Sequence, residues 1–145
     1  MNIYTIGFTK KSAEKFFSTL GNSGASRLID VRLNNVSQLA GFAKKDDLRY
    51  FCKQICNIDY LHLAELAPTA ELLTAYRKKT IDWQTYERNF LDLMVQRRVE
   101  QTVLKDLIDG GCLLCSEESP TRCHRRLVAE YLSAKWGNLV IQHLR

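Results

Sequence analysis

The alternation of short apolar, β-rich runs with longer segments of helical periodicity most constrains how this chain can fold. Five runs have the length and composition of strands, and they cover residues 3–6, 28–31, 58–63, 112–115 and 139–141. Between these runs apolar residues recur at helical spacing, in the segments 12–22, 48–55, 69–109 and 120–135. Strands that alternate with helices predict an α/β fold with a mostly parallel, Rossmann-like sheet and right-handed crossovers.

One domain over residues 1–145 is the expected organisation, because a chain of 145 residues suffices to bury a single hydrophobic core. The run 28–31 is apolar with little alternation, which is typical of a strand buried on both faces, so we expect it at the centre of the sheet. Ser12 is the expected N-cap of the first helix.

The composition predicts a cytoplasmic protein without membrane segments. No run approaches the roughly 18 apolar residues of a membrane span, and the first residues lack the pattern of a signal peptide. Five cysteines, an odd number beside an adequate core, favour free thiols in a reducing compartment. A net charge of +5 favours anionic partners, either a small molecule or nucleic acid, but the charges are spread along the chain, and a charge of this size is more often a solubility feature. The oligomeric state cannot be predicted.

Residues that directly follow the strands are the first candidates for a site, because ligands of such sheets bind beyond the carboxyl ends of the strands. These residues are Gly7-Phe8-Thr9, Arg32, the segment 115–118 and His143. Asp30 and Arg32 are two residues apart, so both project from the same face if the strand persists to Arg32. The carboxylate can orient a substrate group while the guanidinium holds a phosphate. Alternatively, the pair is an internal salt bridge.

The segment after Cys115 predicts a helix that begins with cations. Ser119 is the expected N-cap and Pro120 the first helical residue, which places basic side chains in the first two turns: Arg122, His124, Arg125 and Arg126. Cations there oppose the helix dipole at about 0.3–1 kcal/mol each, and a bound anion resolves the conflict. Alternatively, three carboxylates neutralise the cations within the protein: Glu117, Glu118 and Glu130.

His124 and Cys115 are candidates for chemistry, each with a structural alternative. His124 falls within the apolar stripe of the last helix and should face the sheet, as an acid-base group or as a hydrogen-bonded core residue. Cys115 ends an apolar run near a helix start and several arginines, an environment that makes a thiol nucleophilic. Cysteine is also among the most commonly buried residues, so packing is the other interpretation.

Several known motifs are excluded by their spacing. A phosphatase loop needs an arginine where Thr121 stands, and neither a Walker loop nor a G-x-G-x-x-G fingerprint occurs. Cys112 and Cys115 have C-x-x-C spacing and Cys123-His124 follows, but in a strand the first two side chains point to opposite faces. We therefore expect no metal site, and the cofactor, if any, is unknown.

Three motifs of the chain resemble those of a bacterial and archaeal family, domain of unknown function 488. They are Tyr4-Thr5-Ile6-Gly7-Phe8-Thr9, Ile29-Asp30-Val31-Arg32 and Leu114-Cys115-Ser116-Glu117-Glu118-Ser119-Pro120-Thr121-Arg122-Cys123-His124-Arg125. The family patterns are T-I-G-[HF]-[ST], D-V-R and C-[AS]-E-x-x-P-x-x-C-H-R. The resemblance spans nearly the whole chain and implies a single three-layer α/β fold. It also implies a shared site made of Thr5, Asp30, Arg32, Cys115, Glu117, Cys123, His124 and Arg125, without an established activity.

Two segments depart from the family patterns. After D-V-R the family often has a basic, proline-containing segment where this chain has residues 33–37, and it often has Leu-Gly-Gly near Ala64-Glu65-Leu66. Specificity carried by these loops is therefore expected to differ. A weaker similarity to rhodanese domains rests on D-V-R and on a cysteine before a helix, and it is an analogy only.

The leading hypothesis is recognition of a phosphate-bearing ligand, such as a nucleotide derivative or a nucleic-acid end. The expected ligand-binding residues are Thr5, Gly7, Arg32, Arg122, Cys123 and Arg125, and the acid-base candidates are Asp30, Glu117 and His124. A second hypothesis is thiol chemistry, with Cys115 as nucleophile and Cys123 as resolving partner. In a third, the cluster is a structural network and the domain binds a partner without catalysis. Whether the protein is an enzyme stays open.

Overall fold

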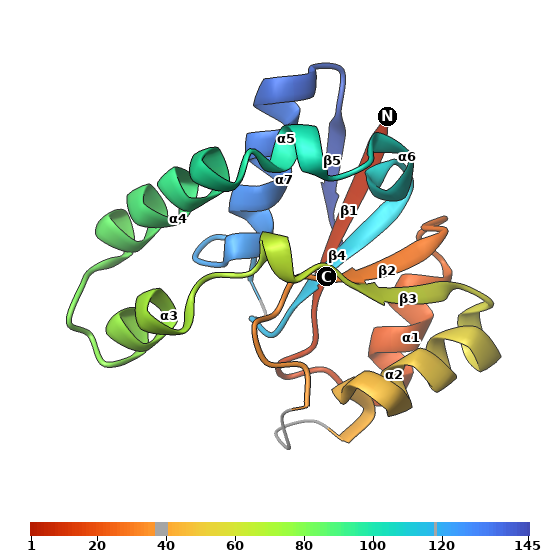
Figure 1. Ribbon diagram of the computed structural model, residues 1–145. Coiled ribbons are helices and arrows are strands. Elements are labelled where there is room, and N and C mark those ends of the chain that lie inside the picture. Colours follow the sequence, from red (N-terminus) through yellow and green to blue (C-terminus); the bar gives the residue numbers. More distant parts are fainter. Residues whose placement is uncertain (37–40, 118) are drawn as a thin grey trace.

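Five parallel strands form one sheet in the computed structural model, which describes residues 1–36, 41–117 and 119–145 (Figure 1). The strand order is β3-β2-β4-β1-β5. The strands are β1 (Asn2–Gly7), β2 (Arg27–Asp30), β3 (Asp59–His62), β4 (Gly111–Cys115) and β5 (Val140–His143). All neighbouring pairs are parallel, which confirms the predicted Rossmann-like sheet.

Helices cover both faces of the sheet and complete the three layers (Figure 1). They are α1 (Ala13–Gly21), α2 (Lys45–Phe51), α3 (Ala70–Arg77), α4 (Trp83–Arg97), α5 (Val99–Thr102), α6 (Lys105–Ile108) and α7 (His124–Trp136). Helices α1 and α2 pack on one face, against Ile6, Leu28 and Leu114. Helices α4 to α7 pack on the other face, against residues that include Ile29 and Leu113. Three short turns complete the elements: η1 (Gly41–Ala43), η2 (Cys52–Cys56) and η3 (Ala64–Leu66).

The middle strand of the sheet is β4 and not, as the sequence suggested, β2. All residues of β4 are buried, and it lies between β1 and β2. Strand β2 is also interior and paired on both sides, so its apolar pattern correctly indicated burial. Both strands show the same pattern, because every strand paired on both sides and covered by helices on both faces needs it.

The first helix agrees with its sequence signals, whereas the second changes to a wider helical turn before the end of the expected segment. The Ser12 hydroxyl accepts the amide N–H of Lys15, and α1 buries Phe16, Phe17 and Leu20. Helix α2 ends at Phe51 and continues as a π-helical turn over Cys52–Cys56. The wider turn changes the angular spacing of the side chains, and Ile55, expected on the buried face, is 59% exposed.

The last helix begins at His124, four residues later than the sequence signals placed it. The Ser119 hydroxyl accepts the amide of Thr121, which makes a local turn instead of an N-cap. Cys123 has an extended backbone, and its side chain makes no capping hydrogen bond. Arg122 therefore precedes the helix, and the first turn carries His124, Arg125 and Arg126.

The segment 69–109 is mostly helical, as expected, but it is divided into α3, α4, α5 and α6. Helices α3 and α4 form an antiparallel arm that extends from the sheet (Figure 1). Across the described residues, no helix has the length and apolarity needed to cross a membrane. The arm and the carboxyl ends of the strands enclose a pocket.

Candidate functional site

A pocket of about 1180 Å³ lies between the carboxyl ends of β1, β2 and β4, the start of α7 and the arm of α3 and α4. Its inner wall consists of residues from the predicted motifs: Phe8, Thr9, Arg32, Cys115, Ser116, Glu117, Arg122, Cys123 and His124. Its outer wall consists mainly of residues 73–86 of the arm, among them Tyr76, Arg77, Lys79, Trp83 and Tyr86. The motifs, which are far apart in the sequence, therefore meet in one cavity.

Asp30 binds the side chain of Arg32 with both carboxylate oxygens. Arg32 Nε donates to Oδ1 at 2.9 Å and Nη2 donates to Oδ2 at 2.8 Å. The backbone amide of Arg32 also donates to Oδ1, and the Tyr60 hydroxyl donates to Oδ2 at 2.5 Å. Burial raises the pKa of Tyr60, and the neighbouring Asp30 raises it further, so the phenol stays a donor. Asp30 is thus an anchor for Arg32, with its oxygens occupied by donors.

Arg32 is a buried cation with one free donor group. Its Nη2 also donates to the Ala43 carbonyl at 2.8 Å, and the guanidinium lies over the Phe8 ring at 5.2 Å. Burial alone lowers the pKa of Arg32, but the hydrogen bonds and charge of Asp30 raise it overall, so the side chain stays charged. Its Nη1 is buried without a hydrogen-bond partner in the described part of the chain. Because Arg32 lines the pocket, a ligand there can supply this partner.

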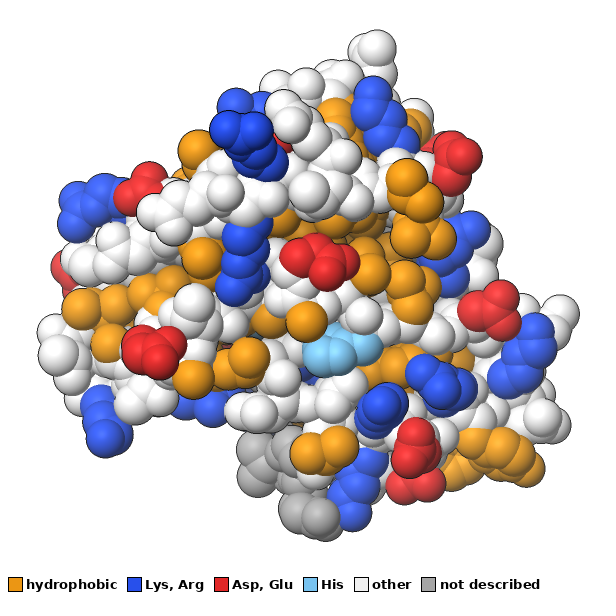
Figure 2. All heavy atoms as spheres, in the orientation of Figure 1, with side chains coloured by type: hydrophobic (Ala, Val, Ile, Leu, Met, Phe, Trp, Pro, Cys, Tyr) orange, Lys and Arg blue, Asp and Glu red, His pale blue; other side chains and the backbone are white. Residues whose placement is uncertain are grey.

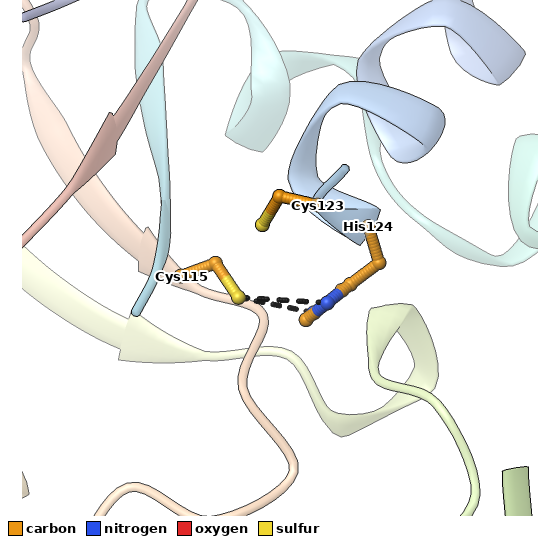
Figure 3. A group of neighbouring side chains, drawn as sticks. All are labelled: Cys115, Cys123 and His124. Carbon is orange, nitrogen blue, oxygen red and sulfur yellow. Dashed lines mark hydrogen bonds between the residues drawn. The ribbon is translucent and has the colours of Figure 1, made fainter. Parts of the chain in front are cut away.

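Cys115 and His124 are in direct contact at the inner wall (Figure 3). Cys115 Sγ lies 3.5 Å from Nδ1 and 3.8 Å from Nε2 of the imidazole. The Nε2 atom is also 2.7 Å from the Val31 carbonyl oxygen, which only accepts hydrogen bonds. Nε2 therefore carries a proton, and in the neutral ring Nδ1 is the basic nitrogen. The sulfur is almost equidistant from the two nitrogens, so the contact places a thiol beside a base without lying along the Nδ1 lone pair.

Cys123 makes the environment of Cys115 asymmetric. The hydrogen bond donated by Cys123 lowers the pKa of Cys115, and Arg125 together with the amides of Ser116 and Glu117 acts in the same direction against the effect of burial. Burial and the neighbouring Cys115 raise the pKa of Cys123 well above the ordinary thiol value. The pair thus favours a thiolate at Cys115 and a thiol at Cys123.

Arg125 supports the site from behind instead of lining the pocket. Its side chain is completely buried, and Nη1 donates to the Glu117 carbonyl at 2.6 Å. The amide of Thr9 donates to the Ser116 carbonyl at 3.0 Å, which ties the same loop to the end of β1. Arg125 was expected to contact the ligand, but its position assigns it to holding the loop that carries Glu117.

The other predicted residues divide between the pocket wall and the layer beneath it. Thr5 is buried in β1, and its hydroxyl lies 2.6 Å from His143 Nδ1. Gly7, also buried, lies against Glu117 and Arg125. Neither Thr5 nor Gly7 lines the pocket, whereas Glu117 and Arg122 line it and are exposed. Arg126, beside the site, forms ion pairs with Glu87 and Glu130. Glu130 is one of the carboxylates that the sequence offered as neutralising partners for the cations of this helix.

The C-x-x-C pair does not form a unit. Cys112 belongs to the core on the side of α1 and α2, whereas Cys115 belongs to the core on the side of α7. Cys115 instead joins Cys123 and His124, and the ligand atoms of these three residues all lie within 4.8 Å of one another. The sequence argument against zinc concerned Cys112 and Cys115, and it does not bear on this group. All five cysteines are free thiols in the structure.

A family comparison agrees with the motifs around the pocket. The family model described as domain of unknown function DUF488 matches residues 12–132. The chain belongs to this family. The DUF488 match includes both Asp30-Val31-Arg32 and the segment from Cys115 to Arg125, whereas Thr5 and Gly7 precede it. No curated protein and no solved structure matches the chain.

Two groups of residues at the DUF488 site were missed from the sequence. Tyr60, which binds Asp30, comes from β3, and nothing in its local pattern separates it from an ordinary strand residue. The arm contributes stacked and tilted rings of Tyr76, Trp83 and Tyr86. These rings appeared only as apolar positions of helices, because a helical pattern indicates a buried face without naming what lies against it.

Proposed function

We propose that this DUF488 domain binds a ligand with a phosphate or similar anionic group in the pocket. The observation that supports the proposal is the buried, charged Arg32, whose Nη1 is left without a protein partner among the described residues. An unsatisfied buried donor costs about 1–3 kcal/mol, and an anionic oxygen in the pocket offsets this cost. Asp30 and Tyr60 orient the guanidinium before the ligand arrives, which reduces the entropy cost of binding.

The outer wall favours a ligand that also carries a flat ring. Tyr76 and Trp83 are among the residues that line the pocket, as are the basic Arg77 and Lys79. Aromatic faces stack on nucleobases, and cations beside them attract phosphates. A nucleotide derivative combines both features, and the pocket volume of about 1180 Å³ accommodates a ligand of that size.

The distribution of charge favours a small ligand or a nucleic-acid end over a long nucleic-acid track. In the space-filling view, Lys and Arg side chains are scattered among acidic ones instead of forming a continuous strip (Figure 2). Extended binding of nucleic acid depends on many phosphate contacts along such a strip. The proposed contact is therefore a single anionic group held at Arg32.

Binding is tested by a thermal-shift screen with nucleotides, nucleotide sugars, short oligonucleotides and inorganic phosphate, at low and high salt. A ligand at about 100 times its dissociation constant adds roughly 2.7 kcal/mol of stability. Arg32→Lys keeps the charge but lacks the Nη1 donor, and we expect it to abolish most of the shift. Arg88→Lys, at an exposed position outside the pocket, is the matched control. An unchanged shift in Arg32→Lys contradicts the proposal, as does the absence of any shift.

A second candidate function, thiol chemistry, is favoured by the contact of 3.5 Å between Cys115 Sγ and His124 Nδ1. Transfer of the thiol proton to Nδ1 leaves a thiolate that attacks an electrophilic ligand in the pocket. Iodoacetamide measures this directly, by mass spectrometry of the alkylated peptides. Cys115 should be alkylated faster than Cys112, and His124→Gln should slow the reaction. If Cys115 in the folded protein resists alkylation, its role is packing. The domain is then better described as one that binds a partner without catalysis.

A further inference from the structure

We propose that Cys115, Cys123 and His124 bind one zinc ion, with the fourth coordination position facing the pocket. Their three ligand atoms lie within 4.8 Å of one another, and all three residues are buried. Figure 3 shows the two sulfur atoms and the imidazole around a common point between the end of β4 and the start of α7. Two thiolates and an imidazole are donors that zinc prefers over oxygen-binding ions such as magnesium.

The spacing of sulfur and nitrogen is within reach of one zinc ion. With a Zn–S bond of about 2.3 Å, a Zn–N bond of about 2.0–2.1 Å and a tetrahedral angle, the two ligand atoms are about 3.5 Å apart. Cys115 Sγ and His124 Nδ1 are 3.5 Å apart, but Sγ is also 3.8 Å from Nε2. The imidazole therefore has to turn for the Nδ1 lone pair to point at an ion shared with the sulfur.

The hydrogen bond of His124 leaves the appropriate nitrogen for the ion. Its Nε2 donates to the Val31 carbonyl at 2.7 Å, so in the neutral ring Nδ1 is the nitrogen with a free lone pair. A histidine that binds zinc usually donates its other ring N–H to a carbonyl or carboxylate, which fixes the tautomer and the ring plane. Val31 directly follows β2, so the end of this strand holds the Nε2–H group of the imidazole.

The charge of the group also fits a divalent ion. Binding displaces the thiol protons of Cys115 and Cys123, and the two thiolates neutralise Zn²⁺. The ion thus joins two buried thiols without leaving a net charge in the core. Cys115 ends a central strand and Cys123 directly precedes α7, so rigid elements position both ligands.

The fourth coordination position of the proposed zinc ion is open to the pocket. All three ligands line this cavity together with Arg32 and Glu117. Three protein ligands and one exchangeable position are typical of catalytic zinc sites, in which the fourth ligand is water or the bound substrate. The zinc proposal does not rest on the anion proposal, because ligand binding at Arg32 and metal binding at the cysteines are measured separately.

Cobalt titration of the purified full-length chain tests the site, after treatment with a chelator and a reductant. One Co²⁺ per chain should give thiolate-to-metal charge-transfer absorption and the intense visible bands of tetrahedral cobalt, and Zn²⁺ should displace it. Cys123→Ser and His124→Gln should weaken binding by at least about 100-fold, since loss of even an outer-shell partner costs about 10–100-fold. Cys112→Ala, on the same strand but the opposite face, is the matched control and should bind normally.

His124→Cys keeps a zinc ligand at the same position and should retain binding with stronger thiolate absorption. This variant separates loss of a ligand from loss of the fold, which circular dichroism checks in each variant. The proposal is overturned if cobalt gives no thiolate band in the folded wild-type protein. It is equally overturned if the band survives both Cys123→Ser and His124→Gln. In either case the contact of Cys115 with His124 belongs to the thiol chemistry alone.

Discussion

Gly7 lies directly against the carbonyl group of Glu117, so close that a Cβ atom added at Gly7 would stand 1.6 Å from the carbonyl oxygen. The same atom would lie 3.0 Å from Arg125 Nη1, which donates to that oxygen. The end of β1, the loop after β4 and the first turn of α7 thus meet at one crowded point. The pocket wall that carries Glu117 depends on this packing.

We expect Gly7→Ala to destabilise the protein by about 1–3 kcal/mol, because backbone has to move to admit the methyl group. Gly41→Ala is the control, since a Cβ atom at Gly41 meets nothing within 4 Å among the described residues. Urea denaturation of both variants measures the difference. Equal stability of Gly7→Ala and Gly41→Ala would falsify the packing described here.

Arg125→Met should lower the free energy of unfolding by about 1.5–3 kcal/mol, which is the range for a hydrogen bond to a charged group. Methionine fills much of the same buried volume but cannot donate to Glu117. Arg88→Met, at an exposed position, should change stability by no more than about 0.5 kcal/mol. If Arg125→Met instead left stability unchanged and only reduced ligand binding, the supporting role assigned to Arg125 would be wrong.

Tyr60→Phe removes one of the two side chains that bind Asp30 Oδ2. We expect the free energy of unfolding, measured by chemical denaturation, to fall by about 1–3 kcal/mol, because a buried carboxylate oxygen loses a donor. Ligand affinity should also fall, since Arg32 is then less firmly oriented. Tyr50→Phe, at an exposed tyrosine, is the matched control for the lost hydroxyl. A Tyr60→Phe variant as stable as Tyr50→Phe would contradict the arrangement.

Alkaline pH should destabilise the protein through Cys52. Burial raises the pKa of this thiol from 9.0 to about 12. A raised pKa in the folded state means that the stabilising contribution is complete below pH 9 and is lost as the pH rises toward 12. Between these values a single group changes the free energy of unfolding by up to about 1.4 kcal/mol per pH unit.

Cys52→Ala removes this group, so its free energy of unfolding should fall less steeply with pH than that of the wild type between pH 9 and 12. Denaturation curves at several pH values measure the two slopes. Because the alanine variant also loses packing, its stability is expected to be lower at every pH, and only the slope is diagnostic. Identical slopes would show that Cys52 is not protected from ionisation in the folded protein.

The succession of strands and helices along the chain could be predicted from the sequence, because apolar periodicity is a local property. The alternation of β-rich and helical segments indicated a parallel sheet. The two-residue spacing of Asp30 and Arg32 suggested that they act together, and they form a bidentate pair, although strand β2 ends at Asp30. The three motifs also marked the carboxyl ends of the strands, where the pocket lies.

Local sequence patterns predicted the start of the last helix less well, because two local interactions of the same residue compete there. Ser119 and Pro120 have the composition of a helix start, but the Ser119 hydroxyl binds the amide of Thr121 and the helix begins at His124. A capping residue can serve a turn or a helix, and neighbouring packing decides between them. The dipole argument for Arg122 therefore failed, although Arg122 does line the pocket.

The sequence by itself determined the succession of strands and helical regions, the fold class and the end of the sheet at which the site lies. Only the tertiary structure decided that β4 is the middle strand, that Tyr60 binds Asp30, and that Arg125 lies behind the pocket. It also brought His124 to Cys115 and placed the arm across the site. The physical reason is that periodicity records only whether a side chain is buried, whereas strand order and the direction of each side chain decide what it meets.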